Sequence, residues 1–209
     1  MPVDEERDRL RRLAESFGAP LPDATVDALL AYGQLLLDWN RRINLTGAKS
    51  LAELIEDHFP DAFAVAARLD GAPAVLDVGS GGGLPAIPAA LLAPGASFVL
   101  MEPIHKKAAV LRTAARAGGL GPRVTVRAER LDDAPPSERD PVFDVAMSRA
   151  TFQPDAWLVK AVRLVRPSGR ILALSSTATV AVPTGLRLAE SVAYGSSARR
   201  WLLVLIRST

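Results

Sequence analysis

The chain has 209 residues, 49% of them hydrophobic, and a formal net charge of +2 at pH 7. This length and hydrophobic content predict one sizeable domain, or one domain with a small extension. No apolar run approaches the roughly 18 residues that a membrane span needs, and the first residues lack the apolar stretch of a signal peptide. The sequence has no cysteine and only two histidines, which excludes disulfides and thiolate metal sites. We therefore expect a cytoplasmic protein without a metal or a membrane partner, whose isoelectric point near 9.3 permits contact with nucleic acid.

Residues 4–69 are predicted to be helical, because apolar side chains recur at helical spacing through this part of the chain. The segment that begins at Ser50 carries Glu53 three residues later, which is the pattern of a capping box. We therefore expect a helical N-terminal extension over residues 1–70, packed on the domain that follows it.

From residue 73 onward, short β-rich runs alternate with helical runs, and the chain is predicted to end in a pair of strands joined by a turn. Alternation of this kind predicts a doubly wound, Rossmann-like α/β sheet, mostly parallel with an antiparallel C-terminal strand. This domain is expected to cover residues 71–209. Residues 132–141 are predicted to form a surface loop, because they are rich in proline and charged residues.

The first strand of the alternation runs into a cluster of glycines, in the stretch VLDVGSGGGLPAIP over residues 75–88. Ligands of open α/β sheets bind at the carboxyl ends of strands, so the turn after this strand is the expected site. Four of the five residues 79–83 are glycines, which can take positive φ and approach a ligand without a Cβ clash. Pro85 and Pro88 suit the start of a helix. A tight turn without a ligand is the alternative, and the density of glycines favours a binding site.

The residues around the glycines indicate which ligand binds. No Lys-Ser or Lys-Thr follows them, which excludes a P-loop, but residues 81–86 formally match the dinucleotide pattern G-x-G-x-x-A. Asp77 extends the motif to D-x-G-x-G-x-G, which is typical of class I methyltransferases that bind S-adenosylmethionine. An acidic strand end suits the ammonium and sulfonium of that cofactor. Glu102 ends the next β-rich run, at about the 20-residue spacing where a carboxylate binds ribose hydroxyls; the alternative for Glu102 is a solvated charge.

Five motifs carry a resemblance to a known family, and they are WNRRINLTG (39–47), DHFPDAF (57–63), LDVGSGGGLPAIPAALLAP (76–94), EPIHKKAAVLR (102–112) and MSRATF (147–152). In this order they resemble the small-subunit ribosomal RNA methyltransferase G family, also called glucose-inhibited division protein B. The resemblance implies a bacterial cytoplasmic enzyme that methylates N7 of one guanine in 16S rRNA, with S-adenosylmethionine as methyl donor. The implied partner is the small ribosomal subunit and not DNA, and a monomer is expected.

The expected cofactor-binding residues come from two sources. The resemblance implies, by position, Gly79, Leu84, Ala128, Glu129 and Arg149. The glycine pattern and the acidic strand ends add Asp77, Gly81, Gly83 and Glu102. Within this set, Ala128 and Glu129 are expected to border the adenine, and Arg149 is expected to close the site.

RNA affinity is expected from basic side chains that contact phosphates. The candidates are Arg41, Arg42, Lys106, Lys107, Arg112, Arg199 and Arg200, together with Asn44 of the Asn-Leu-Thr motif. For Asn44 and Thr46 a structural role is equally open, in which Asn ends a helix in the left-handed region and Thr caps the next segment. Aromatic residues are few, at 5%, which favours one structured RNA site over a long unpaired strand.

No catalytic acid or base is expected for this reaction. N7 of guanine carries an in-plane lone pair, so the enzyme must only align the reactants, which can contribute roughly 7–11 kcal/mol. His58 and His105 are accordingly expected to be structural or surface residues. A carboxylate such as Glu129 can stabilise the cationic product electrostatically.

The chain departs from the family pattern in its RNA-facing half. Asp57 stands where a basic residue is usual, and Ala62 replaces a serine in the His-x-x-Asp-Ser stretch. Ser175 and Ser176 stand where Lys-Gly is usual. These departures leave two alternatives open: a methyltransferase that acts on another RNA or a small molecule, and a non-catalytic module that binds S-adenosylmethionine.

Overall fold

A computed structural model describes residues 2–71, 74–131, 143–195 and 200–209, so the predicted loop at 132–141 lies outside the described ranges. The helices are α1 (Pro2–Ser16), α2 (Asp23–Asn40), α3 (Leu51–Asp57), α4 (Phe59–Ala66), α5 (Ala86–Leu92), α6 (His105–Ala117), α7 (Pro154–Ala161) and the 3₁₀ turn η1 (Val162–Leu164). The strands are β1 (Ala74–Val78), β2 (Ser97–Met101), β3 (Val124–Arg127), β4 (Phe143–Ser148), β5 (Val165–Ser175), β6 (Leu186–Tyr194) and β7 (Arg200–Arg207).

The strands form one seven-stranded sheet in the order β3-β2-β1-β4-β5-β7-β6. Neighbouring strands from β3 to β5 are parallel, whereas β7 is antiparallel to both β5 and β6. This confirms the predicted sheet and the predicted pair of C-terminal strands. The chain leaves β1 toward β2 on one side and leaves β4 toward β5 on the other. The carboxyl ends of β1 and β4 therefore mark the switch point where ligands of such sheets bind.

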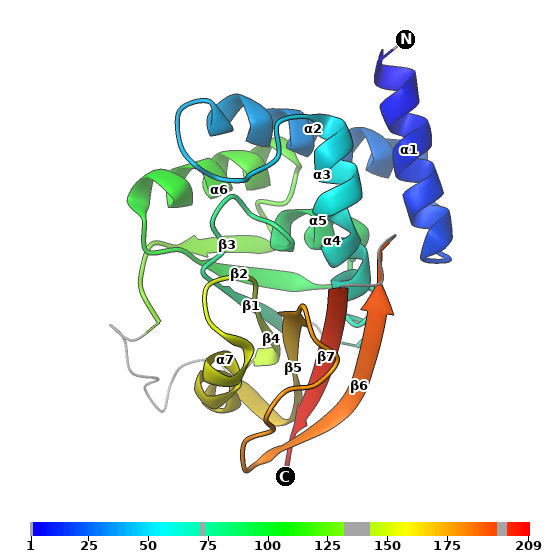
Figure 1. Cartoon of the computed structure of the whole chain (residues 1–209). Helices are drawn as coiled ribbons and strands as arrows, with labels where there is room; N and C mark the ends of the chain where they lie inside the picture. The colour runs from blue at the N-terminus through cyan, green and yellow to red at the C-terminus, as the bar shows by residue number, and fades with distance from the viewer. Residues whose placement is uncertain (1, 72–73, 132–142, 196–199) are drawn as a thin grey trace.

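Helices cover both faces of the sheet, α2 to α6 on one face and α7 on the other (Figure 1). Alternate strand residues point to opposite faces, so Val75 joins one buried cluster while Leu76 joins a second cluster with Trp157 of α7. Full burial of a side chain such as Phe59 of α4 contributes about 1.5–3 kcal/mol. The N-terminal helices share the first cluster with β1 and β2, and the division into residues 1–70 and 71–209 stays a prediction.

The start of α3 confirms the predicted cap at Ser50, whereas the reciprocal bond of Glu53 goes to Lys49 and not to Ser50. Oγ of Ser50 accepts the N–H of Glu53 at 3.2 Å, and the carboxylate of Glu53 accepts the N–H of Lys49 at 2.9 Å. The helix is only seven residues long and ends at Asp57, and α4 begins at Phe59. His58 is therefore placed at the corner between two short helices. No helix within the described ranges is both long and apolar enough to cross a membrane.

Candidate functional site

The glycine cluster forms a tight loop between β1 and α5. Gly79, Gly81 and Gly83 have φ values of +77°, +57° and +98°, in the region that side chains other than glycine rarely adopt. The N–H of Gly79 donates to the carbonyl of Met101 at 2.8 Å, which ties the loop to the end of β2. Tyr32 of α2 donates to the carbonyl of Gly82 at 3.0 Å, so the N-terminal helices hold the loop from the other side.

The four loop glycines face different surroundings. A Cβ on Gly82 would lie 2.8 Å from Cδ1 of Leu36, and a Cβ on Gly83 would lie 2.7 Å from Cγ1 of Ile87, so these two glycines allow close packing. A Cβ on Gly81 would meet nothing closer than the carbonyl of Gly79 at 3.9 Å. Gly81 therefore borders open space at the switch point, which is where a ligand can approach the backbone.

Gly79 lies under a residue from another strand end. A Cβ on Gly79 would lie 2.1 Å from Oγ1 of Thr151, in the segment that follows β4. The hydroxyl of Thr151 lies 3.3 Å from the carbonyl of Gly79. The glycine at this position therefore allows the two strand ends of the switch point to meet.

Glu102 is fixed beside the open side of the loop. Its side chain is only 4% exposed, and its two carboxylate oxygens accept the N–H groups of Gly81 and Ile104, each at 2.8 Å. The alternative that Glu102 is a solvated charge is therefore wrong. A carboxylate oxygen has more than one lone pair, so the fixed group can still accept hydrogen bonds from ribose hydroxyls.

Asp77 is buried at the end of β1 with an unsatisfied oxygen. The residue is 1% exposed, and its Oδ2 has no hydrogen-bond partner in the part of the chain that the structure describes. Burial raises the pKa of Asp77 to about 7; a hydrogen bond from Ser80 and the charge of Arg149 act in the opposite direction, and Glu102 adds to the rise. A buried, unpaired carboxylate oxygen costs stability, and a cationic ligand group would satisfy it.

The remaining predicted cofactor residues lie in and around the same edge of the sheet. Leu84 is buried in the loop before α5. Ala128 and Glu129 are half-buried and follow β3, next to the end of β2, where the N–H of Glu102 donates to the carbonyl of Arg127 at 3.0 Å. Open backbone, an unpaired acidic oxygen and a fixed carboxylate fit a nucleoside that carries an ammonium group, as S-adenosylmethionine does. Within the described ranges, no group of three or more His, Asp or Glu side chains could hold a metal ion.

A cavity of about 770 Å³ lies beside the loop, at the ends of β4 and β5, and we call it the β4 cavity. Its lining includes Asp57, His58, Asp61, Arg149, Thr151, Phe152, Ser175, Ser176, Tyr194 and Arg200. Thr151 also contacts Gly79, so the β4 cavity adjoins the glycine loop.

Arg149, which follows β4, is held by two residues of the N-terminal helices. Its Nε lies 2.6 Å from Oδ2 of Asp61, and its Nη2 lies 2.7 Å from Nδ1 of His58. Asp61 also accepts the hydroxyl of Tyr194 at 2.9 Å. We call Asp57, His58, Asp61, Arg149, Tyr194 and Arg200 the Asp61 cluster. Of its members, only Arg149 was predicted from the sequence as a cofactor residue, and the positions of the others depend on contacts between distant segments.

Arg200 is placed differently from the expectation that it contacts phosphate. Its guanidinium donates to the backbone carbonyl of Asp57, and it pairs with Oδ1 of Asp57 at 3.2 Å and Oδ1 of Asp61 at 3.5 Å. Two carboxylates thus offset its charge. Arg199 lies outside the described ranges.

The loop after α2 is organised by Asn40, which was not among the predicted site residues. Its Oδ1 accepts the N–H groups of Leu45 and Thr46 at 2.8 and 3.1 Å. The predicted structural roles of Asn44 as a left-handed helix end and Thr46 as a helix cap are wrong, because α2 ends at Asn40 with right-handed backbone at Arg41, and Ser50 caps α3. Thr46 has a different structural role, since its hydroxyl accepts the N–H of Ala48. A side-chain amide at the end of a helix, next to a loop, was the signal that could have identified Asn40.

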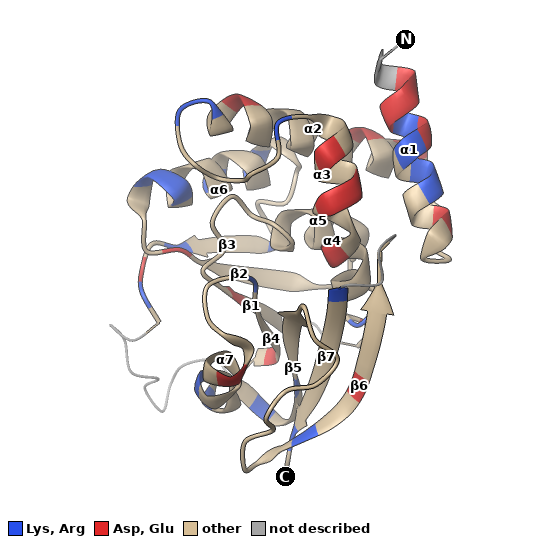
Figure 2. Cartoon of the chain, viewed as in Figure 1, with Lys and Arg blue, Asp and Glu red and all other residues tan. Residues whose placement is uncertain are grey.

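The other basic candidates lie around the same edge. Figure 2 shows basic residues at the end of α2 and at the start of α6. Arg41, Arg42, Asn44, Lys106 and Arg112 are exposed and Lys107 is half-buried. Arg112 also donates to the carbonyl of Val126 at 3.2 Å.

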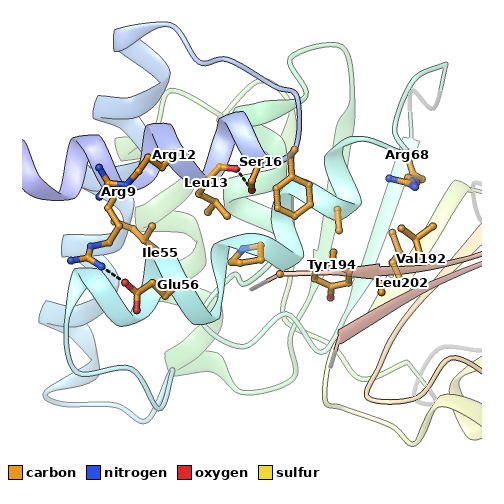
Figure 3. Close-up of a pocket in the computed structure, with 15 residues that line it drawn as sticks. Arg9, Arg12, Leu13, Ser16, Ile55, Glu56, Arg68, Val192, Tyr194 and Leu202 are labelled. Carbon is orange, nitrogen blue, oxygen red and sulfur yellow. Dashed lines mark hydrogen bonds and ion pairs between the residues drawn. The ribbon is translucent and has the colours of Figure 1, made fainter. Parts of the chain in front are cut away.

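A second cavity, of about 590 Å³, lies between α1, α3 and the end of β6 (Figure 3). Arg9 and Glu56 pair across one end of it, and Tyr194 lines both this cavity and the β4 cavity. None of the nine predicted cofactor residues, all of which the structure describes, lines it. The β4 cavity is the candidate substrate site, because Arg149 lines it and Thr151 connects it to the glycine loop.

Comparisons with known proteins test the family resemblance. The family model described as rRNA small subunit methyltransferase G matches residues 25–181. The Ribosomal RNA small subunit methyltransferase G of Aromatoleum aromaticum is 35% identical over 94% of this chain and 96% of its own length. That of Nitrosococcus oceani is 38% identical over 75% of this chain and 71% of its own. The family resemblance inferred from the motifs is confirmed.

Solved structures agree with the fold. The O-methyltransferase from Bacillus cereus in complex with SAH is 18% identical, with a TM-score of 0.59 over 90% of this chain and 92% of its own. TrmN from Thermus thermophilus is 24% identical, with a TM-score of 0.57 over 70% of this chain and 48% of its own. At these identities the similarity establishes a class I methyltransferase fold.

Proposed function

Because the chain belongs to the rRNA small subunit methyltransferase G family, we propose that it transfers the methyl group of S-adenosylmethionine to N7 of a guanine in 16S rRNA. The family acts on ribosomal RNA of the small subunit, and its methyl donor is S-adenosylmethionine. The observation that carries the assignment to this site is the open side of Gly81 between two buried carboxylates, Asp77 and Glu102. A cytoplasmic monomer without a DNA partner stays a prediction.

The cofactor would lie along the carboxyl ends of β1, β2 and β3. Oδ2 of Asp77 would accept the ammonium group, Glu102 the ribose hydroxyls, and Ala128 and Glu129 would border the adenine. Gly81 would present its backbone to the cofactor, with Gly79 and Leu84 in the same loop. When bound, S-adenosylmethionine would supply a methyl group activated by its sulfonium.

The chain's own residues then have to place the guanine. N7 has a free lone pair at neutral pH, so no side chain needs to remove a proton, and catalysis follows from alignment. The β4 cavity adjoins the glycine loop through Thr151, so a base within it would lie next to the cofactor. Arg149 lines that cavity, and its charge acts on Asp77.

The exposed basic residues at the end of α2 and the start of α6 would bind rRNA phosphates. Arg41, Arg42, Lys106 and Lys107 surround the same edge as the loop. Arg200 is left out of this surface, because Asp57 and Asp61 pair with it.

Methyl transfer to ribosomal subunits tests the proposal. Purified protein and tritiated S-adenosylmethionine are incubated with 30S subunits, or with naked 16S rRNA, from a strain that lacks the gene. N7-methylguanosine is then located by reduction and aniline cleavage, and one new cut is expected. Gly81→Val should not restore the cut. Parallel reactions contain other cellular RNA or a pool of small molecules in place of the subunits; label in these with unlabelled 16S rRNA would support the first alternative. Cofactor binding without any transfer would support a non-catalytic module.

A further inference from the structure

His58 has a defined tautomer in this structure. Its Nδ1 lies 2.7 Å from Nη2 of Arg149, and its Nε2 lies 3.2 Å from Oγ1 of Thr46. A guanidinium has only donors, so Nδ1 must be the acceptor and must lack a proton. The ring proton is therefore on Nε2 and points to the hydroxyl of Thr46, which also accepts the N–H of Ala48.

Asp61 binds a second nitrogen of the same guanidinium. It lies three residues after His58, near the start of α4, and Arg149 Nε approaches its Oδ2 to 2.6 Å. Its second oxygen accepts the hydroxyl of Tyr194. Asp61 is 4% exposed, so water hardly competes for these bonds. The guanidinium of Arg149 is thus held at two of its nitrogens by one short segment, which contains His58 and Asp61.

The guanidinium of Arg149, which His58 and Asp61 hold, lies at the candidate substrate site. Arg149 lines the β4 cavity and comes two residues before Thr151, which covers Gly79. Its charge also acts on Asp77, the carboxylate with the unsatisfied oxygen. A displacement of Arg149 would therefore change both the shape of the cavity and the field at the predicted ammonium position.

We propose that His58 and Asp61 are positioning residues for methyl transfer, which hold Arg149 between the β4 cavity and the glycine loop while Thr46 fixes the imidazole with its proton on Nε2. This inference rests on the proposed function for its role in the reaction. The contacts themselves connect the loop after α2 to Arg149 by way of Thr46 and His58.

Protonation of His58 would release the arrangement, because Nδ1 would become a donor facing another donor. Burial lowers the pKa of His58; the charges of Arg149 and Arg200 lower it further, while Asp61 and Asp57 raise it. The imidazole is then neutral at neutral pH, and methyl transfer should fall at acid pH as His58 titrates.

Nuclear magnetic resonance of the imidazoles tests the contacts directly. The chain has two histidines, so a His105→Asn background leaves His58 as the single imidazole signal. We expect the Nε2-protonated tautomer and a titration of His58 below the ordinary pKa of about 6.5. In Arg149→Met this titration should move to higher pH, because a neighbouring positive charge is removed. An Nδ1-protonated ring, or a titration that Arg149→Met does not move, would overturn the proposal.

Two amide substitutions separate positioning from simple packing. In His58→Asn the amide oxygen replaces Nδ1 and can still accept from Arg149, whereas in His58→Gln the amide reaches the Nε2 position and that bond is lost. We expect His58→Asn to retain kcat within about 3-fold and to lose the decline at acid pH, and His58→Gln to lower kcat about 10-fold or more, the scale of a hydrogen bond to a charged group. Asp61→Asn should also lower kcat.

The melting temperature of each variant is measured in parallel, and equal rates and equal acid declines for the two amide variants would refute a positioning role. The tautomer and titration of His58 can be as expected while neither the wild-type protein nor any variant methylates rRNA. In that case the proposed function is refuted, and the contacts of His58 with Arg149 and Thr46 are confirmed. If transfer occurs and the imidazole results are absent, the positioning role fails alone.

Discussion

The glycine loop and the Asp61 cluster lie side by side at the same edge of the sheet. A buried carboxylate belongs to each region, Asp77 at the end of β1 just before the loop and Asp61 within the cluster, and the two differ in their partners. Asp77 is 1% exposed and has an oxygen without a partner among the described residues. Asp61 is 4% exposed and accepts Arg149, Arg200 and Tyr194. The two carboxylates are thus similarly buried, but the hydrogen bonds of Asp77 are incomplete, whereas both oxygens of Asp61 have partners. The unsatisfied oxygen of Asp77, together with the open side of Gly81, is therefore the feature from which we propose a ligand site.

The largest expected effect comes from filling the open side of the loop. Gly81→Val should abolish binding of S-adenosylmethionine in calorimetry, because a branched side chain would occupy space that is free in the structure. Valine at φ +57° also costs about 1–2 kcal/mol of backbone strain.

Gly119→Val is the matched control for that strain, since Gly119 has φ +67° and no atom within 4 Å of the position that a Cβ would take. It should lose similar stability and retain binding. Normal affinity in Gly81→Val would show that the cofactor does not use this loop, and tight binding of NAD instead would change the assigned ligand.

The second effect tests the unpaired carboxylate. Asp77→Asn should weaken cofactor binding by about 1.5–3 kcal/mol, the scale of a hydrogen bond to a charged group, while it stabilises the ligand-free protein at pH 8. The pKa of Asp77 rises from 3.8 to about 7 in the folded chain, so the folded state holds an extra proton between these values. The stabilisation that the raised pKa of Asp77 gives is therefore full below pH 3.8 and is lost as the pH rises to about 7. Over this range the free energy of unfolding should fall by roughly 4 kcal/mol.

Thermal unfolding of wild type and Asp77→Asn across pH 4 to 8 measures this contribution. The difference between the two proteins should grow in favour of the variant as pH rises. A difference that stays constant with pH would mean that Asp77 is ionised and paired in the free protein.

The third effect concerns Glu102, whose replacement by alanine should weaken cofactor binding by about 1.5–3 kcal/mol. Glu102→Ala also removes the acceptors of Gly81 and Ile104. Glu102→Gln retains an acceptor oxygen for one of them, so a comparison of the two variants separates loss of the ribose contact from loss of loop order. Unchanged dissociation constants in both would leave Glu102 with a purely structural role.

The comparison of the two regions also explains what the sequence could predict. The glycine loop, the cap at Ser50 and the strand–helix alternation depend on residues within a few positions of one another, where local propensity and spacing decide. The Asp61 cluster depends on which distant segments meet: β7 brings Arg200 to Asp57, and β4 brings Arg149 to His58. A spacing pattern carries no information on such contacts, so the sequence alone predicts that Arg200 contacts phosphate, whereas the structure pairs it with Asp57 and Asp61.

The smallest expected effect distinguishes the free basic surface from the paired arginine of the cluster. The side chain of Arg41 is 78% exposed and lies 3.7 Å from Asp38, a pair that contributes little. Arg41→Gln should therefore leave stability unchanged, weaken binding to small subunits a few-fold, and reduce the slope of log affinity against log salt by about one. Arg116→Gln, at the far end of α6, is the matched control and should change neither quantity. Arg200→Gln should instead lower the melting temperature, because it removes the cation that pairs with Asp57 and one of the two cations that pair with Asp61, and should not change the salt slope. A reduced slope in Arg200→Gln with normal stability would mean that this arginine leaves its carboxylates to bind phosphate when RNA is present.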